Sequence, residues 1–414
     1  MNCHAQMASR KVPFPRNNTQ RLQENKAMQH DFNAVIDRSG TYSAKWNTYP
    51  KGVIPMWVAD TDFKSPQPVI DAIVKRAGHG IFGYSADGGD FARATQSWLQ
   101  RRFAWNIETD WVRFVPSLGV GLGSIIRALT SPGDNVLVQT PIYPPFLAVP
   151  ANNERVPLAN PLVWRDGAYH IDFADLEKKL AEPKTTLMML CNPHNPTGRS
   201  FSCEELTRMG ELCRKHSVFI LADEIHSDFV YTGKHITFPS LSPELAAISV
   251  VCINPSKTFN IADMRIAALI APDEEVRKKI TKDLTACKFG MCSLSLAAYC
   301  SAYTECDYYA DQAKNYMREN AEYAVAYFAE KISAISTYKP EATFLLWLDC
   351  RKLGLSQPEL EALFTEKALV ACNSGADFGK KEGTGFMRLN LGCPRSVLQE
   401  ALRRIEKAVK KLGS

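Results

Sequence analysis

The stretch Ile248-Ser-Val-Val-Cys-Ile253, followed directly by Asn254-Pro-Ser-Lys-Thr-Phe-Asn260, decides how the rest of the chain can be interpreted. The apolar, β-branched run predicts a buried strand, and the polar residues after it predict a turn. Lysine is rarely buried without a partner. Desolvation at a strand end would lower the pKa of the Lys257 amine and make it a nucleophile that can form a Schiff base with a carbonyl compound. The ordinary alternative is a solvated surface lysine. The other motifs of the chain decide between a reactive lysine and a surface lysine.

Other apolar runs predict further strands at residues 112–115, 135–140, 186–191, 218–222 and 265–270. Helical patterns stand between and around them at residues 66–77, 91–103, 125–129 and 203–216. Continuous apolar strands that alternate with helices are typical of a mostly parallel sheet covered on both faces. The sequence therefore predicts an α/β fold.

Polar residues follow several of these strands at the point where each strand ends. They are Tyr143, Asn195, Asp223 and Lys257. In parallel sheets, ligands bind outside the carboxyl ends of the strands. We therefore expect these four side chains to lie close together, although they are far apart in the sequence.

Composition predicts a soluble globular protein of 414 residues, with 45% hydrophobic and 22% charged residues. No run approaches the roughly 18 apolar residues of a membrane span. A formal charge of +5, with basic and acidic residues interspersed, argues against a nucleic-acid surface. The twelve cysteines are scattered and form no CxxC pair, which predicts reduced thiols in the cytoplasm and no metal site.

The length is sufficient for two domains. We expect an N-terminal extension at residues 1–30, a segment at 31–60 that packs with a small domain, a large domain at 61–305 and the small domain at 306–414. The small domain should contain a long helix at 308–332, strands at 344–348 and 386–390, and a closing helix at 396–411.

Two shorter features carry weaker signals. Pro116-Ser-Leu-Gly-Val-Gly-Leu-Gly-Ser124 predicts a glycine-rich turn before a helix, where backbone N–H groups could hold a phosphate. Such turns are common, and this one lacks the Lys-Ser/Thr end of a P-loop. Asp60 and Asp62, taken by themselves, favour a helix cap or a turn over a catalytic pair.

Taken together, the motifs resemble a known superfamily. Asn195-Pro-Thr-Gly198, Asp223-Glu-Ile-His226, Ser256-Lys-Thr-Phe-Asn260 and Arg388 are similar, in this order, to motifs of fold type I pyridoxal 5'-phosphate (PLP) enzymes, the class I/II aminotransferase superfamily. The narrower resemblance is to the cystathionine β-lyase (cysteine C–S lyase) branch. It is carried by five segments: Met56-Trp-Val-Ala-Asp60, His79-Gly-Ile-Phe-Gly-Tyr84, Thr140-Pro-Ile-Tyr143, Asp223-Glu-Ile-His226 and Gly385-Phe-Met-Arg-Leu-Asn-Leu-Gly-Cys-Pro-Arg395.

The resemblance implies a mostly parallel seven-stranded sheet in the large domain, a smaller α+β C-terminal domain and PLP as cofactor. It implies that Lys257 binds PLP covalently and acts as catalytic base, and that Asp223 holds the ring nitrogen. Asn195 would contact the phenolate oxygen, with His226 near it, and Tyr143 would stack on the ring. Substrate would be bound by Arg388, Asp60 and Tyr143, with the guanidinium of Arg388 on the α-carboxylate.

By the same resemblance, the phosphate of PLP would be held by Leu118, Gly119, Ser256, Arg265 and Tyr84. Tyr84 would come from a second subunit, which implies a homodimer with shared active sites. The implied reaction is β-elimination from an L-cysteine thioether such as cystathionine, an amino-acid substrate.

Two alternatives remain open at this stage. Arg265 also matches the phosphate-binding arginine of aminotransferases, so an L-amino acid aminotransferase is the first alternative. A regulator that keeps the fold and binds protein or DNA is the second. The roughly thirty residues before the resemblance begins are too few for an additional winged-helix module, since domains typically need about 50 or more.

Overall fold

The computed structural model describes residues 29–412, of which Phe32 onward forms one compact unit. The predicted N-terminal extension at 1–30 lies almost entirely outside the described residues. None of the helices in the described part of the chain combines the length and the apolar character needed to cross a membrane. The described cysteines are all free thiols.

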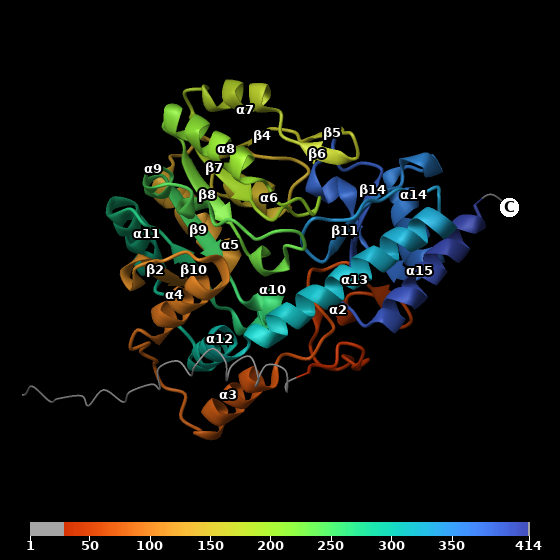
Figure 1. Ribbon diagram of the computed structural model, residues 1–414, viewed down its shortest axis with the longest axis horizontal. Helices are drawn as coiled ribbons and strands as arrows, with labels where there is room; N and C mark the ends of the chain where they lie inside the picture. Colours follow the sequence, from red (N-terminus) through yellow and green to blue (C-terminus); the bar gives the residue numbers. More distant parts are fainter. Residues whose placement is uncertain (1–28, 413–414) are drawn as a thin grey trace, which may run out of the picture. The chain divides into compact units, whose positions relative to one another are not determined.

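The unit is built on a seven-stranded sheet in the order β2-β10-β9-β8-β7-β3-β4 (Figure 1). The strands are β2 Val112–Val115, β3 Asn135–Val138, β4 Val156–Ala159, β7 Thr185–Cys191, β8 Phe219–Asp223, β9 Ser249–Ile253 and β10 Ala267–Ile270. Neighbouring strands are parallel except at β10, which runs antiparallel to both β2 and β9. The predicted mostly parallel α/β sheet is therefore confirmed.

Both faces of this sheet are buried, which explains its continuous apolar strands. Along β7, Leu187 and Met189 belong to one hydrophobic cluster, whereas Met188 and Leu190 belong to the other. Alternate residues of a strand point to opposite faces. The last five positions of β7, residues 187–191, are therefore all apolar, and this part of the strand shows no polar alternation.

Helices cover each face. On the Leu187 side lie α5 Leu118–Leu129, α6 Pro145–Asn152 and α11 Glu274–Cys287. On the Met188 side lie α3 Gln67–Gly78, α4 Asp90–Phe103, α7 Phe173–Leu180, α8 Cys203–Lys215, α9 Pro243–Ala247 and α12 Ser293–Glu305. A hairpin of β5 Val163–Arg165 and β6 Ala168–His170 follows β4.

The C-terminal part forms a second, smaller sheet with its own hydrophobic core. Its strands are β11 Leu345–Asp349, β13 Asn373–Ser374 and β14 Phe386–Asn390, and its helices are α13 Asp307–Lys331, α14 Gln357–Ala362 and α15 Arg395–Lys410. The long helix α13 runs from beside α10 Ser256–Phe259 to beside α15 (Figure 1). Of these elements, α13, β11, β14 and α15 match the predicted helices and strands, whereas β13 and α14 were not predicted.

The N-terminal segment contributes to this smaller core. It contains α2 Ala44–Asn47 and β1 Ile54–Pro55, and β1 pairs in parallel with β12 Val370–Ala371. Met56 belongs to the same hydrophobic cluster as β14 and α15. These contacts agree with a segment that packs on the small domain, while the boundaries at 60 and 305 stay predictions.

Single helical turns join the longer elements. They are η1 Thr109–Trp111, η2 Ser227–Phe229, η3 Phe238–Ser240, η4 Ala262–Met264, η5 Arg351–Leu353, η6 Leu363–Lys367 and η7 Gly375–Phe378.

The predicted glycine-rich turn before residue 125 is wrong, because α5 begins at Leu118. The Ser117 side chain caps the helix by accepting from the N–H of Val120 at 3.3 Å. A Cβ at Gly121 would lie 3.0 Å from a methyl of Leu269 on β10. Glycine lowers helix propensity by about 1 kcal/mol, but here it lets α5 pack closely on the sheet.

Two further expectations are corrected around Lys257. It lies in the short helix α10 and not in an open polar turn, because Phe259 donates to the carbonyl of Pro255 at 2.9 Å. The next strand begins at Ala267 rather than Arg265, and it is antiparallel. Its first residue therefore lies at the same sheet edge as the carboxyl end of β9.

A substitution at Gly198 tests the close contact between the loop after β7 and the segment before β11. Its φ is +70°, and a Cβ there would lie 2.6 Å from Cβ of Pro340, which precedes β11. We predict that Gly198→Ala lowers the free energy of unfolding by about 2–4 kcal/mol, from the left-handed backbone and the clash together. Gly167 has a φ of +79° with nothing within 4 Å. Gly167→Ala should therefore cost only about 1 kcal/mol in the same denaturant titration, and equal losses would contradict the close approach.

Candidate active site

The carboxyl edge of the large sheet brings the predicted polar residues together. Asn195 lies in the loop after β7, Asp223 ends β8, and Lys257 follows β9. The N–H of Tyr143, after β3, donates to the carbonyl of Asn195 at 3.0 Å. The charge of Lys257 acts on Asp223, and that of Asp223 acts on both Lys257 and Tyr143. The predicted convergence of these four residues is confirmed.

The amine of Lys257 is held in a partly desolvated position. Its Nζ donates to the carbonyl oxygen of Ala59 at 2.6 Å. The pKa of Lys257 is lowered to about 8, mainly by burial and also by the charge of Arg388, while the negative charges of Asp60 and Asp223 oppose this change. A sizeable fraction of the amine is therefore unprotonated slightly above neutral pH, as a nucleophile or a general base requires.

Asp223 is a buried carboxyl with little local compensation. The side chain is 2% exposed, and its Oδ1 accepts from the N–H of Ile225 at 3.1 Å. Burial raises the pKa of Asp223 to about 7, against the opposing effects of that hydrogen bond and of Lys257. A cationic or N–H partner would stabilise the ionised form.

His226 lies beside Asp223 as a neutral imidazole. The pKa of His226 is lowered to about 3, mainly by burial and also by the charges of Lys257 and Arg388. The ring meets that of Phe344 edge to face, with centroids 5.6 Å apart. Its Nδ1 is buried and has no hydrogen-bond partner among the described residues.

Arg388 reaches the same place from β14 of the smaller sheet. Its Nη1 donates to Oδ1 of Asn195 at 2.9 Å, and its Nη2 donates to the carbonyl of Trp57 at 2.8 Å and to Oδ1 of Asn373. The guanidinium lies over the ring of Phe378 at 4.8 Å from the centroid. Burial lowers the pKa of Arg388 to about 10, so it remains charged at neutral pH.

The guanidinium is not fully satisfied. Nε of Arg388 is buried without a hydrogen-bond partner among residues 29–412. Buried polar atoms in proteins normally have partners. Together with Nδ1 of His226, this nitrogen indicates that the edge is shaped to receive a further polar molecule.

The residues present fit PLP as that molecule. The amine of Lys257 suits its aldehyde, and the carboxylate of Asp223 suits a protonated ring nitrogen. Because Oδ1 of Asn195 accepts from Arg388, the amide NH₂ is the end that could meet the phenolate oxygen. The first N–H groups of α5, including Leu118 and Gly119, have no partners within the helix and suit a phosphate. Ser256, 9% exposed, lies one residue before Lys257.

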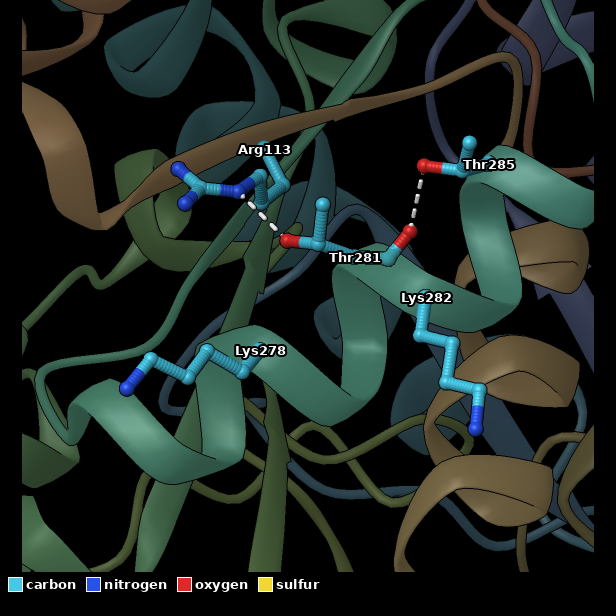
Figure 2. Close-up of a pocket in the computed structure, with 5 residues that line it drawn as sticks. All are labelled: Arg113, Lys278, Thr281, Lys282 and Thr285. Carbon is cyan, nitrogen blue, oxygen red and sulfur yellow. Dashed lines mark hydrogen bonds between the residues drawn. The ribbon is translucent and has the colours of Figure 1, made fainter.

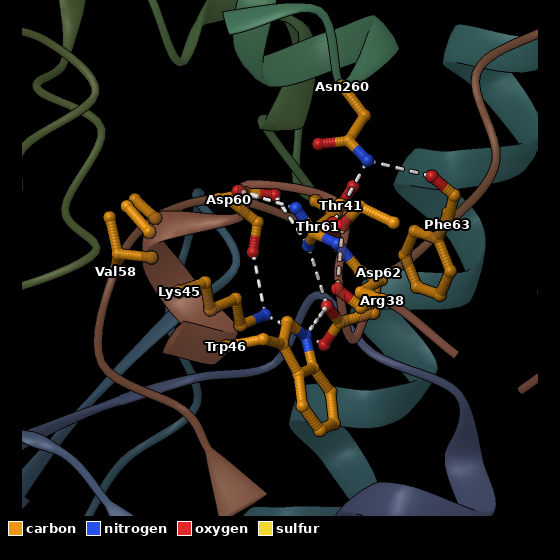
Figure 3. A network of polar contacts seen from close by, with 12 residues as sticks. Arg38, Thr41, Lys45, Trp46, Val58, Asp60, Thr61, Asp62, Phe63 and Asn260 are labelled. Carbon is orange, nitrogen blue, oxygen red and sulfur yellow. Dashed lines mark hydrogen bonds and ion pairs between the residues drawn. The ribbon is translucent and has the colours of Figure 1, made fainter. Parts of the chain in front are cut away.

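Sequence reasoning missed a network that surrounds residues 57–63 (Figure 3). The guanidinium of Arg38 donates to both carboxylate oxygens of Asp60, each at 3.1 Å, and to Oδ1 of Asp62 at 2.8 Å. Asp62 also accepts from Lys45 at 2.8 Å and from Trp46 at 2.9 Å. The expected cap or turn role of Asp60 and Asp62 is therefore wrong. Arg38 and Lys45 carry no local signal, because their partners lie 15 or more residues away along the chain.

Two residues predicted to bind the phosphate of PLP, Tyr84 and Arg265, are exposed on the surface of the chain. Tyr84 is fully exposed, in the loop between α3 and α4. Arg265 is also exposed, in a left-handed conformation with φ of 50°, and within the described part of the chain its guanidinium makes no hydrogen bond or ion pair. Within the single chain, both side chains are therefore exposed and free to contact another molecule.

A shallow hollow elsewhere is lined by Arg113 of β2 and by Lys278, Thr281, Lys282 and Thr285 of α11 (Figure 2). Lys278 pairs with two glutamates of its own helix, at 2.8 and 2.9 Å. Nε of Arg113 donates to Thr281 at 2.8 Å. These partners satisfy much of the polar lining, so we place the chemistry at the sheet edge and not in this hollow.

Comparison with known proteins identifies the family of this chain. A family model described as aminotransferase class I and II matches residues 52–405. The chain belongs to the aminotransferase class I and II family. Cystathionine beta-lyase PatB of Bacillus subtilis (strain 168) is 42% identical over 386 residues, which cover 92% of this chain and 100% of that protein.

Two solved structures of similar proteins contain PLP. Cystalysin of Treponema denticola aligns with a TM-score of 0.90 and 32% identity over 93% of this chain and 100% of that one. The PLP-bound C-S lyase of Staphylococcus hominis aligns with a TM-score of 0.86 and 29% identity, over 92% of this chain and 99% of that one. The predicted fold type I architecture of this family member is confirmed.

The raised pKa of Asp223 predicts a pH-dependent stability in the cofactor-free protein. Between the unfolded pKa, near 3.9, and the folded value of about 7, the native state keeps a proton that the unfolded chain has released. The contribution of this group to stability is therefore complete below about pH 4 and is lost as the pH rises through 7.

We expect Asp223→Asn to become progressively more stable relative to the wild type between pH 4 and 7.5, measured by urea unfolding of the cofactor-free protein. Asp166→Asn, at a side chain that is 85% exposed, should show no such trend. A stability difference for Asp223→Asn that does not change with pH would contradict the assignment.

Proposed function

We propose that this protein is a PLP-dependent carbon–sulfur β-lyase. It cleaves L-cystathionine or a related L-cysteine S-conjugate by α,β-elimination to pyruvate, ammonia and a thiol. The observation that carries the proposal is the partly desolvated amine of Lys257, held beside Asp223 and Arg388 at the sheet edge. The relatives named as cystathionine β-lyase and C-S lyase, aligned over nearly the whole chain, favour this reaction over amino transfer.

Bound PLP supplies an electron sink that stabilises negative charge at the substrate Cα. Lys257 has two proposed roles, since its amine would hold the aldehyde of the cofactor and would take the Cα proton of the substrate as general base. Its lowered pKa lets the amine accept that proton near neutral pH. Asp223 would hold the proton on the ring nitrogen of the cofactor, and this interaction would favour the ionised form of its own carboxyl.

Arg388 orients the substrate. Its guanidinium is fixed by Asn195, Trp57 and Asn373, and its unpartnered Nε remains to bind the α-carboxylate. A rigidly held guanidinium binds a carboxylate through paired hydrogen bonds and sets its direction. In the proposed arrangement, this contact holds the Cα–H bond toward Lys257.

We also propose that the protein acts as a homodimer with shared active sites, in the cytoplasm. Leu118, Gly119, Ser256 and Arg265 would bind the phosphate from one subunit, and Tyr84 would reach it from the other. The exposure of Tyr84, together with that of Ile81 (67%) and Phe82 (62%) in the same loop, supports a partner surface at this position. An exposed aromatic and aliphatic loop is typical of an interface. Tyr143 and Asp60 complete the proposed cofactor and substrate contacts.

An L-amino acid aminotransferase is the competing function. It would use the same lysine and the same cofactor, but it would return a proton to the cofactor side instead of expelling a substituent from Cβ. The observation that favours it is the match of Arg265 to the phosphate-binding arginine of aminotransferases. The need for a second substrate separates the two reactions.

The central prediction concerns product formation from one substrate. The purified protein with PLP should release pyruvate from L-cystathionine without any added keto acid. Lys257→Ala should lose the visible absorption of lysine-bound PLP and reduce pyruvate formation by about 10³-fold or more, because both roles of the amine are removed. Lys278→Ala, at an exposed lysine of α11, is the matched control. Strict dependence on a keto acid would instead establish the aminotransferase.

Arg388→Lys tests the carboxylate contact. The substitution keeps the charge but removes the planar fork and leaves Asn195 and Asn373 without their donors. We expect KM for cystathionine to rise by about 10- to 100-fold, with a smaller fall in kcat. Arg351→Lys, at an exposed arginine paired with Asp349, should leave KM unchanged. An unchanged KM in Arg388→Lys would exclude this residue from substrate binding.

A further inference from the structure

Residues 57–63, which we call the strap, connect the two halves of the candidate site. On one side, Arg388 binds the carbonyl of Trp57 at 2.8 Å, and Asn390 binds those of Val58 at 2.6 Å and Asp60 at 2.8 Å. These donors come from β14 of the smaller sheet.

On the other side, donors from α10 and from the residue that follows it bind three further carbonyls of the strap. Lys257 binds that of Ala59 at 2.6 Å, and Asn260 binds those of Thr61 at 2.9 Å and Phe63 at 2.7 Å. The strap therefore lies between the carboxylate-binding arginine and the reactive lysine, and it is fixed to both.

Two cations hold the acidic side chains of the strap (Figure 3). Lys45 is 1% exposed and binds both Asp62, at 2.8 Å, and the carbonyl of Asp60, at 2.9 Å. Asp62 thus keeps Lys45 and Trp46 as partners when Arg38 is removed. Both oxygens of Asp60, in contrast, are bound by Arg38, in a two-pronged pair whose side chains are 21% and 25% exposed.

Asp60 is the charge of the strap that acts on Lys257. The groups facing this amine are Asp60 from the strap, Asp223 from β8, Arg388 from β14 and His226 after β8. Burial has the largest effect on the pKa of Lys257. The negative charge of Asp60 has the second largest effect, and it raises that pKa. Asp60 and Lys257 are linked through one residue, since Ala59 carries the carbonyl that the amine binds.

We propose that Arg38 is a positioning residue for the reaction, which partly neutralises Asp60 and so sets how strongly the strap holds positive charge on Nζ of Lys257. The inference rests on the proposed role of Lys257. Without Arg38, the uncompensated carboxylate keeps the lysine protonated to higher pH, where it cannot accept the Cα proton. With Arg38 in place, the strap still orients the Lys257 amine, but the Asp60 carboxylate stabilises the protonated amine less than it would without Arg38.

The two partners should therefore have opposite effects. In the PLP-loaded protein, we follow the pH titration of the visible absorption of lysine-bound PLP and the acid limb of the pH profile of kcat. Arg38→Gln should move both midpoints up by about 0.5 to 1 pH unit, and Asp60→Asn should move both down by a similar amount. In the Asp60→Asn background, Arg38→Gln should cause no further shift, because it acts through that carboxylate.

Two controls test charge against structure. Arg38→Lys keeps the positive charge and should return the midpoints to within a few tenths of a unit of the wild type. Arg127→Gln removes a similar two-pronged pair, with Asp283 at 2.7 and 2.9 Å, between α5 and α11. It should leave both midpoints unchanged.

Shifts of the same sign in Arg38→Gln and Asp60→Asn, or no shift in either folded variant, would overturn the proposal. If Arg38→Gln does not fold, an unchanged midpoint in Asp60→Asn overturns it alone. The proposed function fails separately, since absence of any lysine-bound PLP absorption in the wild type contradicts that function and not the coupling within the strap.

Discussion

The removal of the Lys257 amine from water is the constraint on which the rest of the site depends. A charged amine loses hydration at the sheet edge, so its neutral form becomes accessible near physiological pH. The fold achieves this by placing the lysine in α10, directly after a strand that is buried along its whole length. Its only direct polar contact among the described residues is the carbonyl of Ala59.

The same burial shifts the pKa values of the side chains around this amine. It raises the pKa of an acid and lowers the pKa of a base. Burial raises the pKa of Asp223 and lowers those of His226 and Arg388. The cluster thus combines an acid near its titration point, a neutral imidazole and a permanent cation. Perturbed pKa values that converge in this way are typical of a functional site. A bound cofactor with a cationic ring nitrogen and an anionic substrate would complete the charge balance.

The two sheets supply different parts of the site. The large sheet provides Lys257, Asp223 and Asn195, whereas the smaller sheet provides Arg388. The strap is hydrogen-bonded to both, so a shift of one sheet relative to the other would change the environment of the amine. This arrangement explains why a short irregular segment carries so many side-chain hydrogen bonds. It also connects Arg38, through Asp60, with the surroundings of the Lys257 amine.

The sequence by itself determined the α/β sheet and six of its seven strands, all but the edge strand β4. It also determined the convergence of Tyr143, Asn195, Asp223 and Lys257, because apolar period and strand-end topology are local signals. Only the tertiary structure decided that α5 begins at Leu118, since the glycines there serve contacts with β10 that local propensity does not register. It alone also showed that Asp60 and Asp62 are ion-paired. Ion pairs between distant residues have no sequence period, and the charge of a side chain does not identify its partner.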